Sequence, residues 1–262
     1  RQQGLSAKER MLDHNDPRGK AKSAFGNDAD HIRFEMVVST EADQIAIAPG
    51  QLQKEWRQDD RRYFHYKVSA PMCNFYSIVS ARYALKRDSW NGVNLEIYYH
   101  PGHEFNLDRM MQAMKSSLDY YSGNFSPFQY RQLRIMEFPR YTEFAQSFAN
   151  TIPFSEGIGF IFKVHDHDKD IDMAYYITAH EVAHQWWGHQ VMAGGVKGSG
   201  MLSESKAQYS ALKVMEKKLP QEVIGRYLRY ELDSYLSGRA SDKKGEQPLQ
   251  FVEGQNYIHY SK

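Results

Sequence analysis

The sequence contains a single cysteine, Cys73, so the chain cannot form an internal disulfide. A chain without disulfides is typical of a reducing compartment, but many exported proteins also lack them, so the compartment stays open. Cys73 lies in the apolar run APMCNF at residues 70–75, far in sequence from the histidine motif described below. This setting favours a core position over the role of a nucleophile.

The sequence also lacks a long apolar run and an excess of charge of one sign. No apolar run approaches the roughly 18 residues of a membrane span. The 33 Lys and Arg residues nearly balance 32 Asp and Glu, giving a formal net charge of +1, and both signs are mixed along the whole length. A nucleic-acid partner would need a concentrated basic face, so we predict none. The chain starts at Arg1 without a signal peptide and stops abruptly at Lys262, so we expect a piece of a longer polypeptide.

Aromatic residues, by contrast, are abundant and make up 14% of the chain, with 18 Tyr and 14 Phe. Hydrophobic residues account for 41% and charged residues for 25%, which is ordinary for a globular protein. The 262 residues can bury one large core or two smaller ones. Residues 1–30 are polar and show no periodicity, so we interpret them as an extended arm or linker.

Strand signals dominate the next part of the chain. Alternating or aromatic-rich runs occur at residues 31–38, 62–68, 75–83 and 93–99. Breakers such as the Pro-Gly pairs at 49–50 and 101–102 punctuate them. We therefore predict an antiparallel β-sheet domain over residues 31–100.

After residue 100 the periodicity becomes helical. The apolar residues that recur at three- and four-residue spacing are Leu107, Met110, Met111, Met114, Leu118 and Tyr121. They predict an amphipathic helix whose methionines fill a core. Strand-like pieces follow at 132–136 and 158–164, and then three helical stretches at about 171–190, 202–218 and 220–237. The fold class is therefore α+β, with an α-rich domain over residues 101–262.

Residues 180–184 read HEVAH, the HExxH pattern, within a stretch of helical character. Positions i and i+4 of a helix project from the same face, so His180 and His184 can bind one ion. Glu181 points along the same rim, where it can accept a proton from the attacking water. The pattern predicts one Zn2+ per chain and hydrolytic chemistry.

A catalytic zinc needs a third protein ligand and keeps one position open. The glycine-rich segment 194–200 breaks the chain, and a second helix then begins. That helix can fold back so that Glu204 faces the two imidazoles, although Glu204 could instead be an ordinary first-turn glutamate favoured by the helix dipole. His189 is a rival ligand, but it is turned well round the helix from His184. We interpret the run HDHD at 165–168 as a solvated polar turn.

The combination of HExxH with a downstream glutamate resembles the gluzincin metallopeptidases of the aminopeptidase N and leukotriene-hydrolase family. Here 19 residues separate His184 from Glu204, one more than is usual in that family. The glycine-rich loop can absorb the extra residue. The run LSESKAQY at 202–209 resembles the start of the family's second ligand helix.

Two further segments match the family in order along the chain. Glu156, in FSEGIGF at 154–160, occupies the place of the glutamate in the family's Gly-x-Met-Glu-Asn motif, although the other specified positions differ. The resemblance implies that Glu156 binds the α-amino group of the substrate, where a charge-assisted pair would fix the end of the peptide. The alternative is a surface glutamate in a loop. Tyr260 resembles the tyrosine of the family's Tyr-x-Lys-Gly segment, which implies a hydrogen bond to the oxyanion.

The resemblance covers most of residues 31–262. It implies that the β-rich part is the end of a saddle-like N-terminal domain, followed by a thermolysin-like zinc peptidase domain that is truncated at its C-terminus. The runs at 43–50 and 98–103 are most similar to bacterial members fused to transporter-type membrane segments. Membrane-embedded segments in the parent polypeptide are therefore implied by resemblance alone.

The resemblance implies an aminopeptidase that acts on peptide substrates. In this reading His180, His184 and Glu204 hold zinc, and Glu181 and Tyr260 are catalytic. An endopeptidase or another zinc hydrolase is the first alternative, because the motif around Glu156 is altered. A zinc-stabilised binding or sensor domain of a membrane transporter assembly is the second. That module would need neither Glu181 nor Tyr260, but the charge of Lys206 beside the ligand helix keeps it open.

Overall fold

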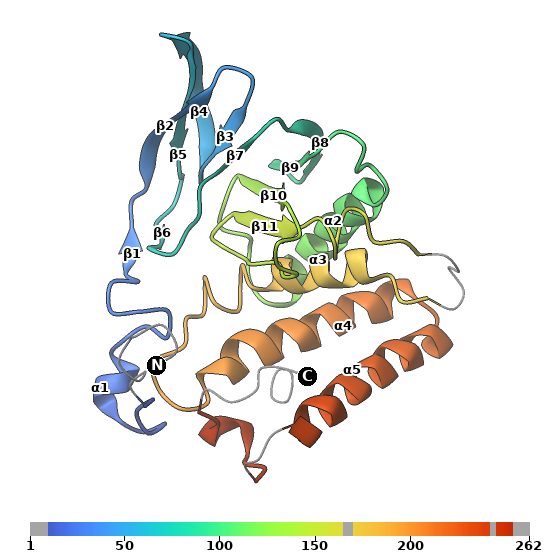
Figure 1. Cartoon of the computed structure of the whole chain (residues 1–262). Helices are drawn as coiled ribbons and strands as arrows, with labels where there is room; N and C mark the ends of the chain where they lie inside the picture. Colours follow the sequence, from blue (N-terminus) through green and yellow to red (C-terminus); the bar gives the residue numbers. More distant parts are fainter. Residues whose placement is uncertain (1–9, 165–169, 242–244, 254–262) are drawn as a thin grey trace.

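The computed structural model describes residues 10–164, 170–241 and 245–253, with a sheet-rich region and a helical region (Figure 1). The sheet-rich region contains three small antiparallel sheets, with strand orders β2-β5-β4, β3-β7 and β1-β6. Their strands are β1 (His31–Ile32), β2 (Glu35–Glu41), β3 (Ile45–Ile47), β4 (Gln51–Gln58), β5 (Arg61–Lys67), β6 (Met72–Cys73) and β7 (Val79–Ala81). Cys73 is fully buried there, as its apolar context predicts.

A four-stranded sheet supports the helical region, with the strand order β11-β10-β9-β8. Its strands are β8 (Ala84–Trp90), β9 (Val93–Tyr99), β10 (Gln132–Phe138) and β11 (Thr151–Ser155). β8 and β9 form an antiparallel hairpin, whose Asn-Gly turn has φ values of 43° and 78° as such turns require. β9, β10 and β11 run parallel, so their carboxyl ends meet at one edge of the sheet.

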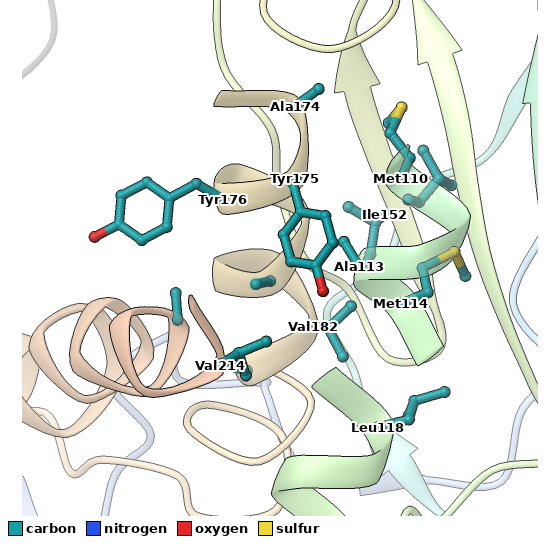
Figure 2. Close-up of a cluster of buried hydrophobic side chains, with 14 of the residues drawn as sticks. Met110, Ala113, Met114, Leu118, Ile152, Ala174, Tyr175, Tyr176, Val182 and Val214 are labelled. Atoms are coloured by element: carbon teal, nitrogen blue, oxygen red, sulfur yellow. The ribbon is translucent and has the colours of Figure 1, made fainter. Parts of the chain in front are cut away.

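The helices of this region are α2 (Leu107–Asn124), α3 (Met173–Ala183), α4 (Lys206–Lys218) and α5 (Gln221–Ser241), with the short 3-10 helix Leu249–Phe251 after them. α2 packs on the four-stranded sheet, α3 packs on α2, and α4 and α5 follow in turn (Figure 1). Nine of the eleven residues of α3 are buried, and a helix that is apolar on all sides belongs inside a core. Figure 2 shows Tyr175 and Val182 of α3 in one cluster with Met110 and Met114 of α2 and with Val214 of α4. The methionines fill the core as predicted, and α3 is held from both sides.

The described part of the predicted arm is packed instead of extended. It contains α1 (Pro17–Lys20), and the N–H of Gly195 donates to the carbonyl of Gly19 at 2.9 Å. Gly198 donates to the carbonyl of Val252 at 2.8 Å, and its φ of +82° favours glycine. Glycines allow this close approach because a Cβ at Gly198 would lie 2.6 Å from a backbone oxygen. The N-terminal arm and the 250–253 segment therefore both hold the glycine-rich loop that precedes Glu204.

Several predicted elements differ from the structure. The predicted strand at 158–164 contains turns, and the real strand, β11, lies just before it. β4 and β8 were not predicted, because both are largely exposed and polar and so carry little hydrophobic signal. The boundary predicted near residue 100 falls inside a sheet, because β9 pairs with both β8 and β10. None of the described helices is both long and apolar enough to cross a membrane.

Candidate metal centre

The HExxH residues lie at the carboxyl end of α3. Asp172 caps the start of this helix by accepting the N–H of Tyr175 at 3.1 Å. The helix ends at Ala183, earlier than the predicted limit of about 190, but His184 keeps helical φ and ψ as its C-cap. His180 and His184 therefore project from one face, with their Nε2 atoms 3.0 Å apart and their ring planes at 84°.

Glu204 approaches this pair from the second helix. It lies in the π-helical turn Met201–Ser205, which leads directly into α4. Its Oε2 lies 3.5 Å from the Nε2 of His180 and 3.5 Å from the Nε2 of His184. A π-helical turn holds one more residue than an α-helical turn, and such turns are frequent at functional sites. It therefore accommodates the extra residue between His184 and Glu204.

The three donor atoms fit a zinc ion. Tetrahedral coordination at about 2.0–2.1 Å puts the ligand atoms about 3.3 Å apart, and the observed separations are 3.0 and 3.5 Å. The Nδ1 of His184 donates to the carbonyl of Trp187 at 2.9 Å. This hydrogen bond fixes the tautomer in which Nε2 carries a lone pair for a metal. His180, His184 and Glu204 could therefore hold the ion, with one coordination position left open.

The electrostatics of this cluster also favour a cation. Burial alone would lower the pKa of His184, but the hydrogen bond and the charge of Glu204 outweigh it and raise that pKa to about 9. Burial would raise the pKa of Glu204, but the two imidazoles hold that pKa far below its usual range. The protein thus stabilises positive charge at this point, as a metal site requires.

Glu181 lies beside the donor atoms without belonging to the cluster of three. It is only 6% exposed, and burial raises the pKa of its carboxyl group. The charges of His180 and His184 oppose this rise in pKa, and a hydrogen bond from the backbone N–H of Ser147 opposes it to a smaller extent. A carboxylate whose pKa is raised toward neutral pH can accept and return a proton, which is the role of a general base.

Gln185 fixes the segment that contains Ser147. Its side chain is fully buried, and its Nε2 donates to the Ser147 Oγ at 2.7 Å and to the Phe148 carbonyl at 2.8 Å. Its Oε1 accepts the N–H of Asn150 at 2.8 Å. This one side chain therefore ties residues 147–150 to the end of α3, and it was not predicted from the sequence.

The donor atoms and Glu181 face a cavity of about 590 Å³. Other lining residues from the 143–146 segment, α3 and α5 include Glu143, Phe144, Gln146, Ile177 and Tyr230. Residues 144–148 run antiparallel beside β11, with the N–H of Gln146 donating to the carbonyl of Pro153 at 3.0 Å. The cavity is therefore bordered by an extended backbone segment. In the sequence, Asn150 is the residue that could have indicated the turn between this segment and β11. Its φ is 58°, a left-handed value that asparagine tolerates.

Glu156 lies away from this lining. It directly follows β11, its Oε1 accepts the N–H of Arg140 at 3.2 Å, and its Oε2 is 3.9 Å from the Nδ1 of His103. It is not among the residues that line the cavity, whereas the exposed Glu143 is. The substrate-binding role of Glu156 therefore stays a prediction, and Glu143 is a carboxylate that the sequence analysis missed.

The remaining predicted residues have different outcomes. Tyr260 and the 165–168 run lie outside the described residues. His189 is 1% exposed, its Nε2 donates to the carbonyl of Ser147 at 3.1 Å, and burial lowers its pKa to about 4. It is a neutral core histidine and not part of the three-residue cluster. Lys206 is exposed at the start of α4 and does not line the cavity.

No protein-family model and no curated protein matches the sequence. Among solved structures, the chain is similar to an M1 zinc metallopeptidase from Deinococcus radiodurans. A mutant of that protein bound to a Tyr-Ser-Ala substrate has a TM-score of 0.62 and 16% identity, covering 85% of this chain and 47% of that chain. A second structure of the same protein has a TM-score of 0.61 and 15% identity, covering 85% of this chain and 47% of that chain.

This chain therefore spans about half the length of the solved structures that it resembles. At such low identity the likeness concerns the fold. The mixed helix and sheet architecture with a sheet-rich region is similar to that of M1 peptidase domains.

Proposed function

We propose that this chain is the catalytic part of a zinc-dependent metallopeptidase, and that it acts as an aminopeptidase on peptides. One observation carries the proposal. Two imidazole nitrogens and one carboxylate oxygen converge at 3.0–3.5 Å, with the buried Glu181 beside them on the wall of a large cavity. A structural zinc site is normally closed by four protein ligands, whereas three ligands and an adjacent base are typical of a hydrolase.

In this proposal His180, His184 and Glu204 hold the zinc ion. When bound, the ion would act as a Lewis acid toward the scissile carbonyl and would lower the pKa of the attacking water. Glu181 accepts the proton of that water and then passes it to the leaving amine. Its raised pKa supports the first step, because a carboxylate of ordinary acidity would be a weaker base toward the attacking water. Tyr260 is proposed to donate a hydrogen bond to the oxyanion.

The 144–148 segment supports an extended peptide as the substrate. Phe144, Ala145 and Gln146 line the cavity, and one edge of this segment pairs with β11 through Phe144, Gln146 and Phe148; we propose that its opposite edge, at Ala145, is open to a peptide. A peptide can add to such an edge by backbone hydrogen bonds, which bind it without regard to its sequence. Membrane-embedded segments as partners stay a prediction of the sequence resemblance.

Two carboxylates are candidates for binding the free amino group of the substrate. Glu156 is the candidate from the sequence resemblance, and Glu143 is the candidate that lines the cavity. A charge-assisted hydrogen bond to an ammonium group contributes about 1.5–3 kcal/mol, or about 10- to 200-fold in kcat/KM. The location of Glu156 away from the cavity lining is the observation that favours the alternative, an endopeptidase.

The test is a panel of fluorogenic aminoacyl substrates, with free and with acetylated amino groups, on the zinc-loaded chain. Free-amino substrates should be cleaved, and acetylated ones should be poor. Glu143→Gln and Glu156→Gln are then compared, and the variant that loses kcat/KM on free-amino substrates alone identifies the anchor. Equal rates on acetylated and free peptides would replace the aminopeptidase with an endopeptidase. A zinc-loaded chain without turnover on either kind would favour a binding domain.

A further inference from the structure

A second group of metal-ligating side chains lies at the carboxyl edge of the four-stranded sheet. Three neighbouring parallel strands each provide one of them: His103 follows β9, Glu137 is the last residue but one of β10, and Glu156 follows β11. The carboxyl ends of parallel strands are where α/β proteins commonly bind ligands. The convergence arises from strand pairing, because these residues are far apart in sequence.

The donor atoms of the three side chains lie close together. All three are within 4.8 Å of one another. The Nδ1 of His103 forms a short hydrogen bond with the Oε1 of Glu137 and lies 3.9 Å from the Oε2 of Glu156. Glu137 is fully buried as a side chain, whereas Glu156 is 18% and His103 29% exposed. The cluster is thus buried at Glu137 and open to solvent at Glu156 and His103, so an ion could enter and leave from the solvent side.

Backbone amides orient both carboxylates. The N–H of His100 donates to the Oε2 of Glu137 at 2.6 Å, and the N–H of Arg140 donates to the Oε1 of Glu156 at 3.2 Å. In each carboxylate one oxygen is held by the main chain, and the other faces His103. This is the arrangement that fixes ligand geometry around a bound metal, because hydrogen bonds to the ligands limit their rotation.

The chain balances only part of the negative charge of the cluster. Among the described residues, neither Glu137 nor Glu156 forms an ion pair with a lysine or an arginine, and His103 is the partner of both. Burial raises the pKa of Glu137, so its ionised form is costly without a cation nearby. A divalent ion would offset this cost directly.

We propose that His103, Glu137 and Glu156 form a second divalent-cation site, separate from the HExxH centre. One imidazole and two carboxylates without a thiolate suit Zn2+ or Mn2+. The site lies next to the catalytic cavity along the chain, because Ile158 lines that cavity two residues after Glu156. The ion would therefore hold the 156–158 turn and with it one wall of the cavity.

The experiment measures Zn2+ and Mn2+ binding by isothermal titration calorimetry and by metal analysis after dialysis. The starting protein is the full chain with His180→Ala and His184→Ala, which removes the first centre and makes the result independent of the proposed peptidase activity. This protein should still bind one ion per chain. Adding His103→Ala and Glu156→Gln should weaken that binding by about 10- to 100-fold or more, since even a lost outer-sphere partner costs that much.

Two controls keep the result interpretable. His65 and Glu35 form a similar pair on the three-stranded sheet, with Nε2 and Oε1 2.7 Å apart, and are not among the clusters of three potential ligands. The variant His65→Ala with Glu35→Gln should leave the second binding event unchanged. Circular dichroism checks that each variant is folded, and His103→Ala alone is used if the double change unfolds the chain. Absence of binding in the starting protein, or binding that survives the loss of His103, would overturn the proposal.

Discussion

The two clusters of metal-ligating side chains use the same residue types and differ in how the fold builds them. His180 and His184 come from one helix, and the Oε2 of Glu204 lies 3.5 Å from both of their Nε2 atoms. His103 instead touches the carboxylate of Glu137 directly. The first arrangement is open at its centre and has Glu181 beside it, while the second satisfies part of its charge internally. We infer that the first serves catalysis and the second serves stability.

The difference in function between the two clusters is tested most strongly at Glu181, because the second cluster has no adjacent carboxylate proposed as a general base. Glu181→Gln should lower kcat by about 10²–10⁴ on a fluorogenic aminoacyl substrate, because loss of a general base typically costs that much. Zinc content should stay unchanged, since this side chain is not among the three ligands. Glu41→Gln, on the exposed end of β2, is the control and should keep the full rate. A zinc-replete Glu181→Gln protein with near-normal kcat would refute the hydrolase mechanism.

The second largest effect is expected at Glu204 and concerns metal affinity. Glu204→Ala should weaken zinc binding by more than the roughly 10- to 100-fold that loss of an outer-sphere partner costs. Competition with a fluorescent chelator measures the affinity of the first centre. Glu216→Ala serves as a control because Glu216 lies on α4, near the surface, and pairs with Lys213. Unchanged affinity would remove Glu204 from the ligands.

The two clusters also differ in how visible they are in the sequence. His180 and His184 form a local pattern, because a helix fixes the geometry of residues four apart. Glu204 was found from the glycine-rich break before a new helix. The second cluster has no local pattern, since His103 and Glu137 meet only through the parallel pairing of β9 and β10. Periodicity within one segment cannot encode such a contact.

The 143–146 segment that lines the cavity was missed for a related reason. The apolar run after Gly157 was interpreted as the strand, but the real strand, β11, contains Pro153, which weakens a strand signal. A proline has no backbone N–H to donate. Pro153 can still pair with the neighbouring segment, because its carbonyl accepts the N–H of Gln146. Glu156 was predicted from the family's Gly-x-Met-Glu-Asn motif, independently of this strand.

A smaller effect, on the free energy of unfolding, is expected from Gln185, which holds residues 147–150 beside the first cluster. Gln185→Ala would leave the N–H of Asn150 and the carbonyl of Phe148 buried without this partner, which typically costs about 1–3 kcal/mol. Urea unfolding monitored by circular dichroism measures the loss. Gln112→Ala, on the exposed side of α2, is the matched change and should be nearly neutral. If Gln185→Ala were equally neutral, the 147–150 segment would be held by other contacts.

The smallest effect should come from replacing His65. This variant tests whether a histidine–glutamate pair alone behaves like the proposed cation site. His65 and Glu35 lie 2.7 Å apart near the surface, and Lys67 also pairs with Glu35 at 2.8 Å. His65→Ala should therefore leave the free energy of unfolding almost unchanged, because an exposed ion pair contributes little and Lys67 remains. The stabilisation of the protein by added Zn2+, measured as a rise in Tm, should also be the same as in the unchanged chain. His103→Ala should reduce that rise, since a bound ion stabilises only the folded state that holds it. Equal responses of the two variants would mean that the cluster at the sheet edge is an ion pair and binds no metal.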